Sequence, residues 1–128
     1  NTAAARRGLA KSYKTEQWLS QQGYLAGFVA ACAANDVELI RRTLKDVVIE
    51  PQRAAAVSCF DAVQTAALSS GALGCSLSGS GPSMFALAED RNARNTASAM
   101  EQACRAMGIE CQSWVSSMSA PGAQVERA

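Results

Sequence analysis

Apolar residues and alanines recur at helical spacing through the first half of the chain, as in amphipathic helices. Pro51 is expected at a first helical position, because the residue before a proline, Glu50, resists the helical conformation. Gly71 is a natural stop after the last of these segments. The helices predicted in this half are Thr2–Leu9, Glu16–Ala34, Val37–Lys45 and Pro51–Ser70.

The pattern changes after Gly71 to short apolar runs on either side of a glycine-rich turn. Residues 73–77 form one run and residues 83–88 another. Between them lies the sequence Gly79-Ser80-Gly81-Pro82, which is typical of a tight turn. Two apolar runs joined by such a turn predict an antiparallel hairpin.

A helix and two further strands are predicted after the hairpin. A polar break at residues 91–93 precedes an amphipathic helix over Asn95–Met107. Residues 109–115 alternate between apolar and polar, as a half-buried strand would, and residues 123–127 predict an edge strand. Helices followed by strands indicate an α+β two-layer sandwich, with helices packed on one face of an antiparallel sheet.

Length and composition are those of one globular domain over residues 1–128. The chain is 48% apolar and carries a net charge of +1, which gives no sign of a nucleic-acid-binding surface. No apolar run has the length of a membrane span, and no secretory signal pattern is present. We therefore expect a cytoplasmic protein that binds neither nucleic acid nor membrane.

The chain has five cysteines and no histidine, which excludes a histidine-based catalytic triad and argues against a zinc site. The number of cysteines is odd, no pair has Cys-x-x-Cys spacing, and each lies among apolar neighbours. This pattern predicts buried, reduced and unpaired thiols. The five are Cys32, Cys59, Cys75, Cys104 and Cys111.

Two features indicate binding of an anion, and each also has an ordinary explanation. The glycines of the turn leave backbone N–H groups unshielded, so Gly79, Ser80 and Gly81 could form a nest for an anion. An ordinary hairpin turn has the same composition. Arg53 is predicted in the first turn of a helix, where the helix dipole disfavours a cation by up to about 1 kcal/mol. An anion facing Arg53 would explain that position, although a solvated arginine is the commoner case.

Four segments together resemble the C-terminal domain of the homoserine kinases, within the GHMP small-molecule kinases. They are Thr2–Arg6 (TAAAR), Leu25–Phe28 (LAGF), Lys45–Arg53 (KDVVIEPQR) and Leu77–Leu87 (LSGSGPSMFAL). The resemblance covers essentially the whole chain, and the order and spacing of the segments make it specific. It implies an ATP-dependent kinase that phosphorylates the hydroxyl group of homoserine in threonine biosynthesis.

The resemblance also implies roles for particular residues. Thr2, Arg6 and Arg53 match positions at the amino-acid substrate, where a guanidinium group suits a carboxylate because it donates two parallel hydrogen bonds. The motif that closes against the phosphate region corresponds to Gly79, Ser80, Gly81 and Ser83. No catalytic residue and no metal ligand is assigned.

Two departures from the family pattern qualify these expectations. The family's Asp-Thr-x-Gly-Ala-Arg segment corresponds to residues 119–124 here, and its arginine position holds Gln124, which receives no role. The glycine-rich ATP loop belongs to an N-terminal domain and is absent from this sequence. We therefore expect ATP and Mg²⁺ to be bound mainly by that domain, no cofactor in this chain alone, and no kinase activity from these 128 residues alone.

Other functions stay open on the sequence. A mevalonate or sugar kinase of the GHMP family would share the glycine motif. Paired Arg6 and Arg53 argue against a neutral sugar, but less against mevalonate, which is also a carboxylate. A stand-alone binding or dimerisation module is the alternative of a different class. The expected partners are homoserine, the chain's own N-terminal domain and a second copy of the chain in a homodimer.

Overall fold

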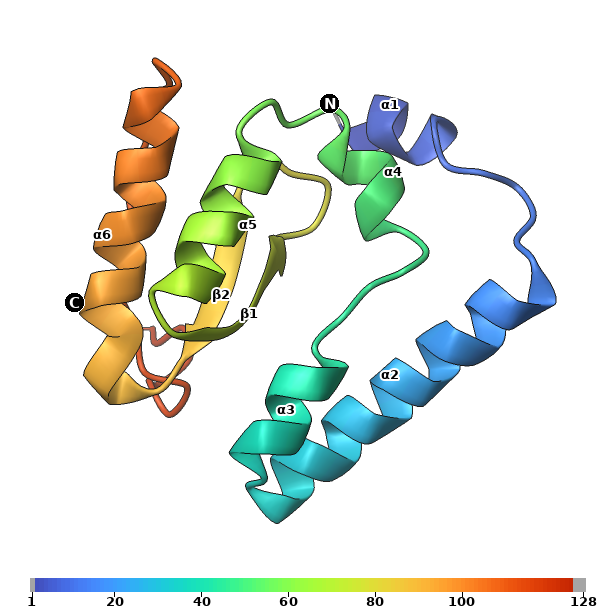
Figure 1. Ribbon diagram of the computed structural model, residues 1–128, viewed down its shortest axis with the longest axis horizontal. Coiled ribbons are helices and arrows are strands. Elements are labelled where there is room, and N and C mark those ends of the chain that lie inside the picture. The colour runs from blue at the N-terminus through green and yellow to red at the C-terminus, as the bar shows by residue number, and fades with distance from the viewer. Residues whose placement is uncertain (1, 126–128) are drawn as a thin grey trace.

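A computed structural model describes residues 2–125 of the chain, and Figure 1 shows how its elements are arranged. The helices are α1 (Thr2–Arg7), α2 (Thr15–Ala34), α3 (Val37–Thr43), α4 (Glu50–Ala54), α5 (Phe60–Ser69) and α6 (Asp90–Ala106). The strands are β1 (Ala72–Leu77) and β2 (Met84–Ala88).

The two strands form an antiparallel hairpin around the glycine turn, as the sequence predicts. Leu77 lies opposite Met84 at the turn end, and Ala72 lies opposite Ala88 at the far end. The N–H of Ser78 donates to the carbonyl of Ser83 at 2.8 Å, which closes the turn. The hairpin therefore holds the glycine turn at one end of the sheet.

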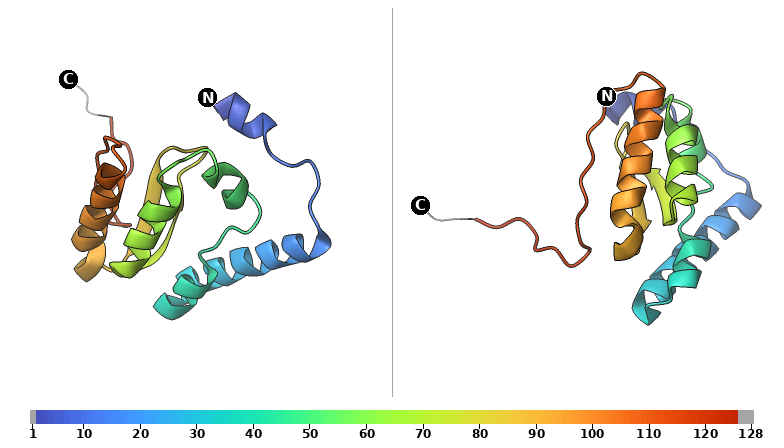
Figure 2. Two further views of the ribbon diagram at one scale, coloured as in Figure 1. Left: turned by 45° about the horizontal axis from the view of Figure 1, so that its top comes forward. Right: turned by 60° about the vertical axis from the view of Figure 1, so that its left-hand side comes forward.

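Helices α5 and α6 cover one face of this hairpin, and Figures 1 and 2 show them side by side. Their core contains Ala67 of α5 and Cys75 of β1, with Ala86 and Met100 packed against it. The predicted fold class, an α+β arrangement with helices packed on an antiparallel sheet, is confirmed.

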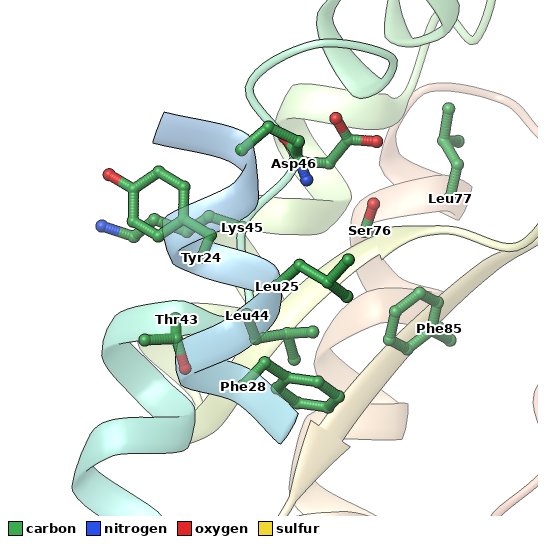
Figure 3. A pocket seen from close by; sticks show the side chains of 11 residues that line it. Tyr24, Leu25, Phe28, Thr43, Leu44, Lys45, Asp46, Ser76, Leu77 and Phe85 are labelled. Carbon is green, nitrogen blue, oxygen red and sulfur yellow. The ribbon is translucent and has the colours of Figure 1, made fainter. Parts of the chain in front are cut away.

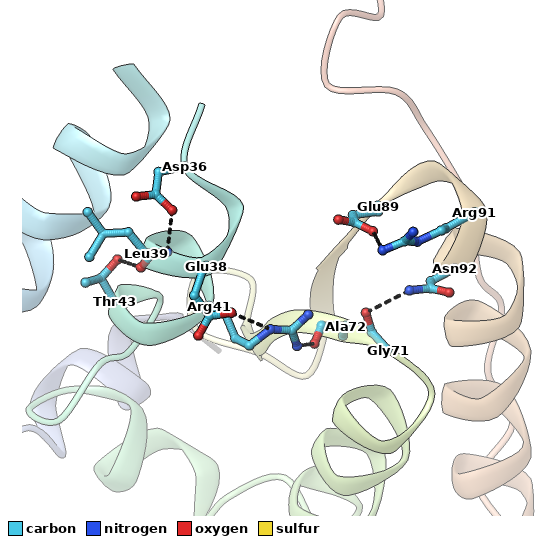
Figure 4. Close-up of polar contacts among 10 residues, drawn as sticks. All are labelled: Asp36, Glu38, Leu39, Arg41, Thr43, Gly71, Ala72, Glu89, Arg91 and Asn92. Atoms are coloured by element: carbon cyan, nitrogen blue, oxygen red, sulfur yellow. Dashed lines mark hydrogen bonds and ion pairs between the residues drawn. The ribbon is translucent and has the colours of Figure 1, made fainter. Parts of the chain in front are cut away.

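Helices α2 and α3 form a hairpin that packs near the opposite face. Leu87 packs with a second core that contains Ala31 and Ile40, whereas its neighbour Ala86 packs with the first core. Successive strand residues point to opposite faces, so the two cores lie on different sides of the sheet. The guanidinium of Arg41 on α3 donates to the carbonyl of Ala72 at 2.9 Å (Figure 4).

The predicted helix over residues 51–70 is wrong as a single element, because the chain turns at residues 55–59 between α4 and α5. Arg53 and Phe60 are seven residues apart and would share one face of a continuous helix. In the structure Arg53 contacts the glycine turn, whereas Phe60 is buried in the core. The turn between α4 and α5 allows these two side chains to face different surroundings.

Helix α6 begins at Asp90, earlier than predicted, and includes residues 91–93, for which the sequence predicts a break. The side-chain amide of Asn92 approaches the carbonyl of Gly71 at 3.4 Å, so this polar residue contacts the end of the α5–β1 turn (Figure 4). Asn92 is therefore polar because it makes a tertiary contact, and not because the helix is interrupted there.

The predicted strand over residues 109–115 does not form. Ser113 donates its hydroxyl to the carboxylate of Glu101 at 2.5 Å, so the segment runs beside α6 and does not join the sheet. Trp114 is 80% exposed. Within the described range no third strand pairs with β1 or β2. Residues 123–125 of the predicted edge strand are also irregular, and residues 126 and 127 lie outside the described range.

Helix α2 is less buried than its apolar pattern predicts. Trp18, Leu25 and Val29 are each more than half exposed, and Cys32 is exposed as well. The helix instead packs through Phe28 and Ala31. No helix in the described part of the chain is both long enough and apolar enough to cross a membrane.

Candidate functional site

The centre of the candidate site is the contact between α4 and the glycine turn. The Nη1 group of Arg53 donates to the carbonyl of Gly79 at 2.6 Å, which joins residues 26 positions apart in the sequence. The Nε atom of Arg53 is buried, and it has no hydrogen-bond partner in the described part of the chain. A buried donor without a partner is energetically unfavourable, so a ligand that accepts from Nε would be stabilised here.

The reason for Arg53's position differs from the one that the sequence suggests. The expected conflict with a helix dipole is absent, because α4 ends at Ala54 and Arg53 lies in its last turn. A cation is favourable in the last turn of a helix. The direction of the guanidinium group is therefore set by its hydrogen bond to Gly79 and not by the helix dipole.

The glycine turn has the backbone conformation that its composition predicts. Gly79 has φ of 66° and Gly81 has φ of 75°, both in the left-handed region that favours glycine. A Cβ atom at Gly81 would lie 3.2 Å from Cγ2 of Val57, on the connection between α4 and α5. The turn and this connection therefore pack closely together.

Part of the predicted anion nest is used within the turn itself. The N–H of Ser78 donates to Ser83, and the N–H of Gly81 donates to the carbonyl of Ser78 at 3.4 Å. The carbonyl of Gly79 faces Arg53. The structure thus brings Arg53 together with the motif that contains Gly79, Ser80, Gly81 and Ser83.

The other predicted substrate residues lie on α1. Figure 1 shows α1 close to α4, and the N–H of Ala10 donates to Oε1 of Gln52 on α4 at 2.7 Å. Arg6 is exposed at the end of α1, and among the described residues no hydrogen bond joins its side chain to α4. The side chain of Thr2 lies outside the described structure.

Sequence reasoning missed two glutamines that connect the elements around α4. Gln52 bonds to Ala10 and also donates its Nε2 group to the carbonyl of Val48. Gln64 on α5 donates to the carbonyl of Cys75 at 2.8 Å and approaches the Glu50 carboxylate at 3.4 Å. Glutamines that bridge distant segments leave no periodic signal in a sequence.

A cavity of about 430 Å³ lies beside α4, lined by Glu50, Pro51, Phe60, Asp61 and Gln64, among others. Burial, and to a lesser degree the negative charge of Glu50, raise the pKa of the nearby Cys75 thiol to about 11. Within residues 2–125 no three acidic or cysteine side chains gather as a metal site.

A second cavity, of about 260 Å³, lies between α2 and the sheet (Figure 3). Its walls are largely apolar and include Phe28 and Phe85. At the edge of this cavity, the ammonium group of Lys45 lies 5.7 Å from the centre of the Tyr24 ring. Asp46, also in the wall, accepts hydrogen bonds from the N–H groups of Val48 and Ile49 at 2.9 and 2.7 Å. These charged groups thus have structural partners.

Comparison with known proteins places these elements in a family. The family model described as "GHMP kinases C terminal" matches residues 28–106, which is more than half of the chain. The chain belongs to this family. The matched range contains both Arg53 and the glycine turn, whereas Thr2 and Arg6 precede it.

Similar proteins of this GHMP kinase family are homoserine kinases. The chain is 39% identical to that of Xanthomonas campestris pv. campestris (strain B100) over 97% of its length, which covers 39% of the relative. It is 41% identical to that of Xylella fastidiosa (strain M12), with the same coverage. The crystal structure of homoserine kinase from Cytophaga hutchinsonii matches with a TM-score of 0.83 and 40% identity, over 86% of this chain and 35% of that one. The chain thus spans about two fifths of the length of these relatives.

Proposed function

We propose that this GHMP kinase domain is the C-terminal half of an ATP-dependent homoserine kinase. In the whole enzyme, the γ-phosphoryl group of ATP is transferred to the hydroxyl group of L-homoserine, a step of threonine biosynthesis. The likeness to homoserine kinases supports this assignment. The observation that carries it is the half-buried Arg53, which is held against the glycine turn with Nε unpartnered.

Arg53 is suited to hold the carboxylate of an amino acid. Its Nη1 group is already engaged with Gly79, so the edge formed by Nε and Nη2 is the one that a carboxylate would use. Two parallel hydrogen bonds on that edge would satisfy the unpartnered Nε. Arg6 supplies a second positive charge from the side of α1, and we assign Thr2 to the same end of the substrate.

The glycine turn links this carboxylate site to the phosphate region. We assign Gly79, Ser80, Gly81 and Ser83 to the part of the site that closes against the phosphates. Phosphoryl transfer depends mainly on positioning and on neutralised charge, so a site built from arginine and backbone groups suits it without histidine. When ATP and Mg²⁺ are bound, they supply the phosphoryl group and the charge that neutralises it.

The whole enzyme requires a further domain. We propose that residues 1–128 form a single C-terminal domain, whose partner is an N-terminal domain carrying the ATP loop. ATP and Mg²⁺ are then bound mainly by that partner, and no cofactor is assigned to this chain alone. We place the parent enzyme in the cytoplasm, where its proposed substrates are available. A homodimer stays a prediction.

A substrate panel with the full-length parent enzyme tests this proposal. Homoserine, mevalonate and galactose are each varied at saturating ATP, and kcat/KM is measured for each. The proposal expects homoserine to be preferred, since Arg6 and Arg53 suit an amino-acid carboxylate. A preference for mevalonate would agree with a carboxylate-binding site but contradict an amino-acid substrate. A preference for galactose would contradict both parts of the proposal.

A further inference from the structure

We infer that Gln52 is a positioning residue, which holds the α1 side of the substrate site at a fixed distance from Arg53. The inference deepens the proposed function and rests on it. Its basis is the pair of hydrogen bonds made by one side-chain amide, from Ala10 on one side and to Val48 on the other. These bonds join two parts of the proposed carboxylate site that come from opposite ends of the first 53 residues.

The two bonds of Gln52 determine the orientation of its amide group. Oε1 accepts from the backbone N–H of Ala10, and Nε2 donates to the carbonyl of Val48. Rotating the amide by half a turn would place a donor against a donor and an acceptor against an acceptor. Gln52 therefore has one favourable orientation and acts as a defined connection between the two backbones.

The Val48 end of the connection is firmly held. The Val48 side chain is buried, and its N–H donates to the carboxylate of Asp46 at 2.9 Å. The adjacent N–H of Val47 donates to the side chain of Gln21 on α2 at 2.9 Å. The segment before α4 is thus tied to α2, and it gives Gln52 a fixed point from which to hold Ala10.

The other end of the connection, Ala10, follows the helix that carries Arg6. The side chains of Arg6 and Arg7 are exposed, so their burial does little to fix this end of the helix. The N–H of Leu9 approaches the carbonyl of Arg6 at 3.4 Å, which continues the end of α1 toward Ala10. Holding Ala10 therefore restrains the helix end that carries Arg6.

The neighbouring residue Arg53 completes the geometry. Gln52 connects α4 to the α1 side, while Arg53 connects α4 to the glycine turn at Gly79. One short helix thus fixes the spacing between Arg6, Arg53 and the glycine turn. Loss of the Gln52 connection would loosen Arg6 relative to Arg53, without removing either arginine.

Steady-state kinetics of the full-length parent enzyme test this role with two variants and a control. Gln52→Ala removes the connection, and Gln52→Met removes its hydrogen bonds while keeping a side chain of similar length. Both should raise KM for homoserine roughly 2- to 10-fold, the range for one neutral hydrogen bond, and leave KM for ATP unchanged. The matched control is Gln102→Ala, since Gln102 is an exposed amide on α6 that bonds only to Ser98 in the described structure, and it should change neither value.

A double variant shows whether Gln52 acts through Arg6. Once Arg6 is removed, its position no longer matters, so Gln52→Ala should add little to the effect of Arg6→Ala. Full additivity of the two effects would overturn the inference. So would an unchanged KM for homoserine in Gln52→Ala, or recovery of the wild-type KM in Gln52→Met, which would show that packing alone matters.

Hydrogen exchange at Ala10 tests the connection itself in the 128-residue chain. Gln52→Ala should make this amide exchange roughly 2- to 10-fold faster, while Gln102→Ala should not. Unchanged exchange would overturn the inference. Failure of the proposed function is separate, because it would appear as wild-type parent enzyme that does not phosphorylate homoserine.

Discussion

Replacing Arg53 with alanine in the full-length parent enzyme should impair the use of homoserine much more than the use of ATP. The side chain has two roles in the proposed site. Its Nη1 group donates to Gly79 at 2.6 Å, and its remaining edge, which includes the unpartnered Nε, is assigned to the substrate carboxylate. The variant removes both the charged contact and the restraint on the glycine turn.

The size of the effect follows from these contacts. Loss of a desolvated charged contact costs about 2–5 kcal/mol, which corresponds to roughly 30-fold to several-thousand-fold in kcat/KM for homoserine. Arg53→Lys should recover only part of the loss, because an ammonium group can reach Gly79 but cannot donate two parallel hydrogen bonds from a planar edge. If Arg53 only binds the carboxylate, the loss appears in KM. If it also aligns the hydroxyl group, kcat falls too.

The assay varies homoserine at saturating ATP and then ATP at saturating homoserine. Arg94→Ala is the matched control, because it removes the same charge from an exposed position on α6. The control should change the rates by no more than a surface substitution does, within about half a kcal/mol. If Arg53→Ala leaves kcat/KM for homoserine at the wild-type value, Arg53 does not belong to the substrate site.

Four further predictions concern the 128-residue chain itself. It should fold but transfer no phosphoryl group from ATP, so titratable kinase activity in a pure sample would contradict the assigned division between two domains. Thiol counting after denaturation without reductant should find five free cysteines, and a count of three or one would disprove this. In the folded chain Cys32 should react with an alkylating agent at pH 8 before Cys75 does, because Cys32 is exposed and the pKa of the buried Cys75 is raised from 9.0 to about 11. Finally, Gly81→Ala should lower the free energy of unfolding by about 1–2 kcal/mol, since φ is 75° there, whereas Gly23→Ala in α2, where a Cβ meets nothing within 4 Å, should stabilise the chain. Equal effects of the two substitutions in thermal or denaturant unfolding would contradict the left-handed assignment.

The elements that the sequence predicts well are those set by local signals. The α2–α3 hairpin is marked by two adjacent residues. Asn35 has a left-handed conformation at the end of α2, and the side chain of Asp36 caps the start of α3. The β1–β2 hairpin is marked by its glycine turn. In both cases the residues that determine the structure lie within a few positions of one another.

The wrong predictions share a different cause, since tertiary contacts determine those segments. The alanines at residues 54–56 favour a continuous helix, yet Arg53 and Phe60 must face different surroundings, and the chain turns between them. Residues 109–115 have the alternation of a strand, but a strand also needs a partner. In the structure this segment contacts Glu101 on α6. Alternation of apolar and polar residues predicts which side chains would be buried, but it does not show whether a neighbouring strand is available for pairing.

The candidate site shows the same division. The resemblance of the Glu50–Arg53 segment and of the glycine motif to a kinase family singled out Arg53, and the structure joins it to Gly79. The dipole argument for Arg53 was wrong, because it assumed a longer helix. The bridge made by Gln52 spans 42 positions, and no local pattern indicates such a contact.

A crystal structure of the full-length parent enzyme with homoserine and a non-hydrolysable ATP analogue would test the central claim most directly. The account predicts that the homoserine carboxylate accepts two hydrogen bonds from Arg53, one of them from Nε, while Nη1 stays on the carbonyl of Gly79. It also predicts Arg6 beside the same carboxylate and the substrate hydroxyl group directed toward the γ-phosphate. Homoserine bound elsewhere, with Nε of Arg53 still unpartnered, would contradict it.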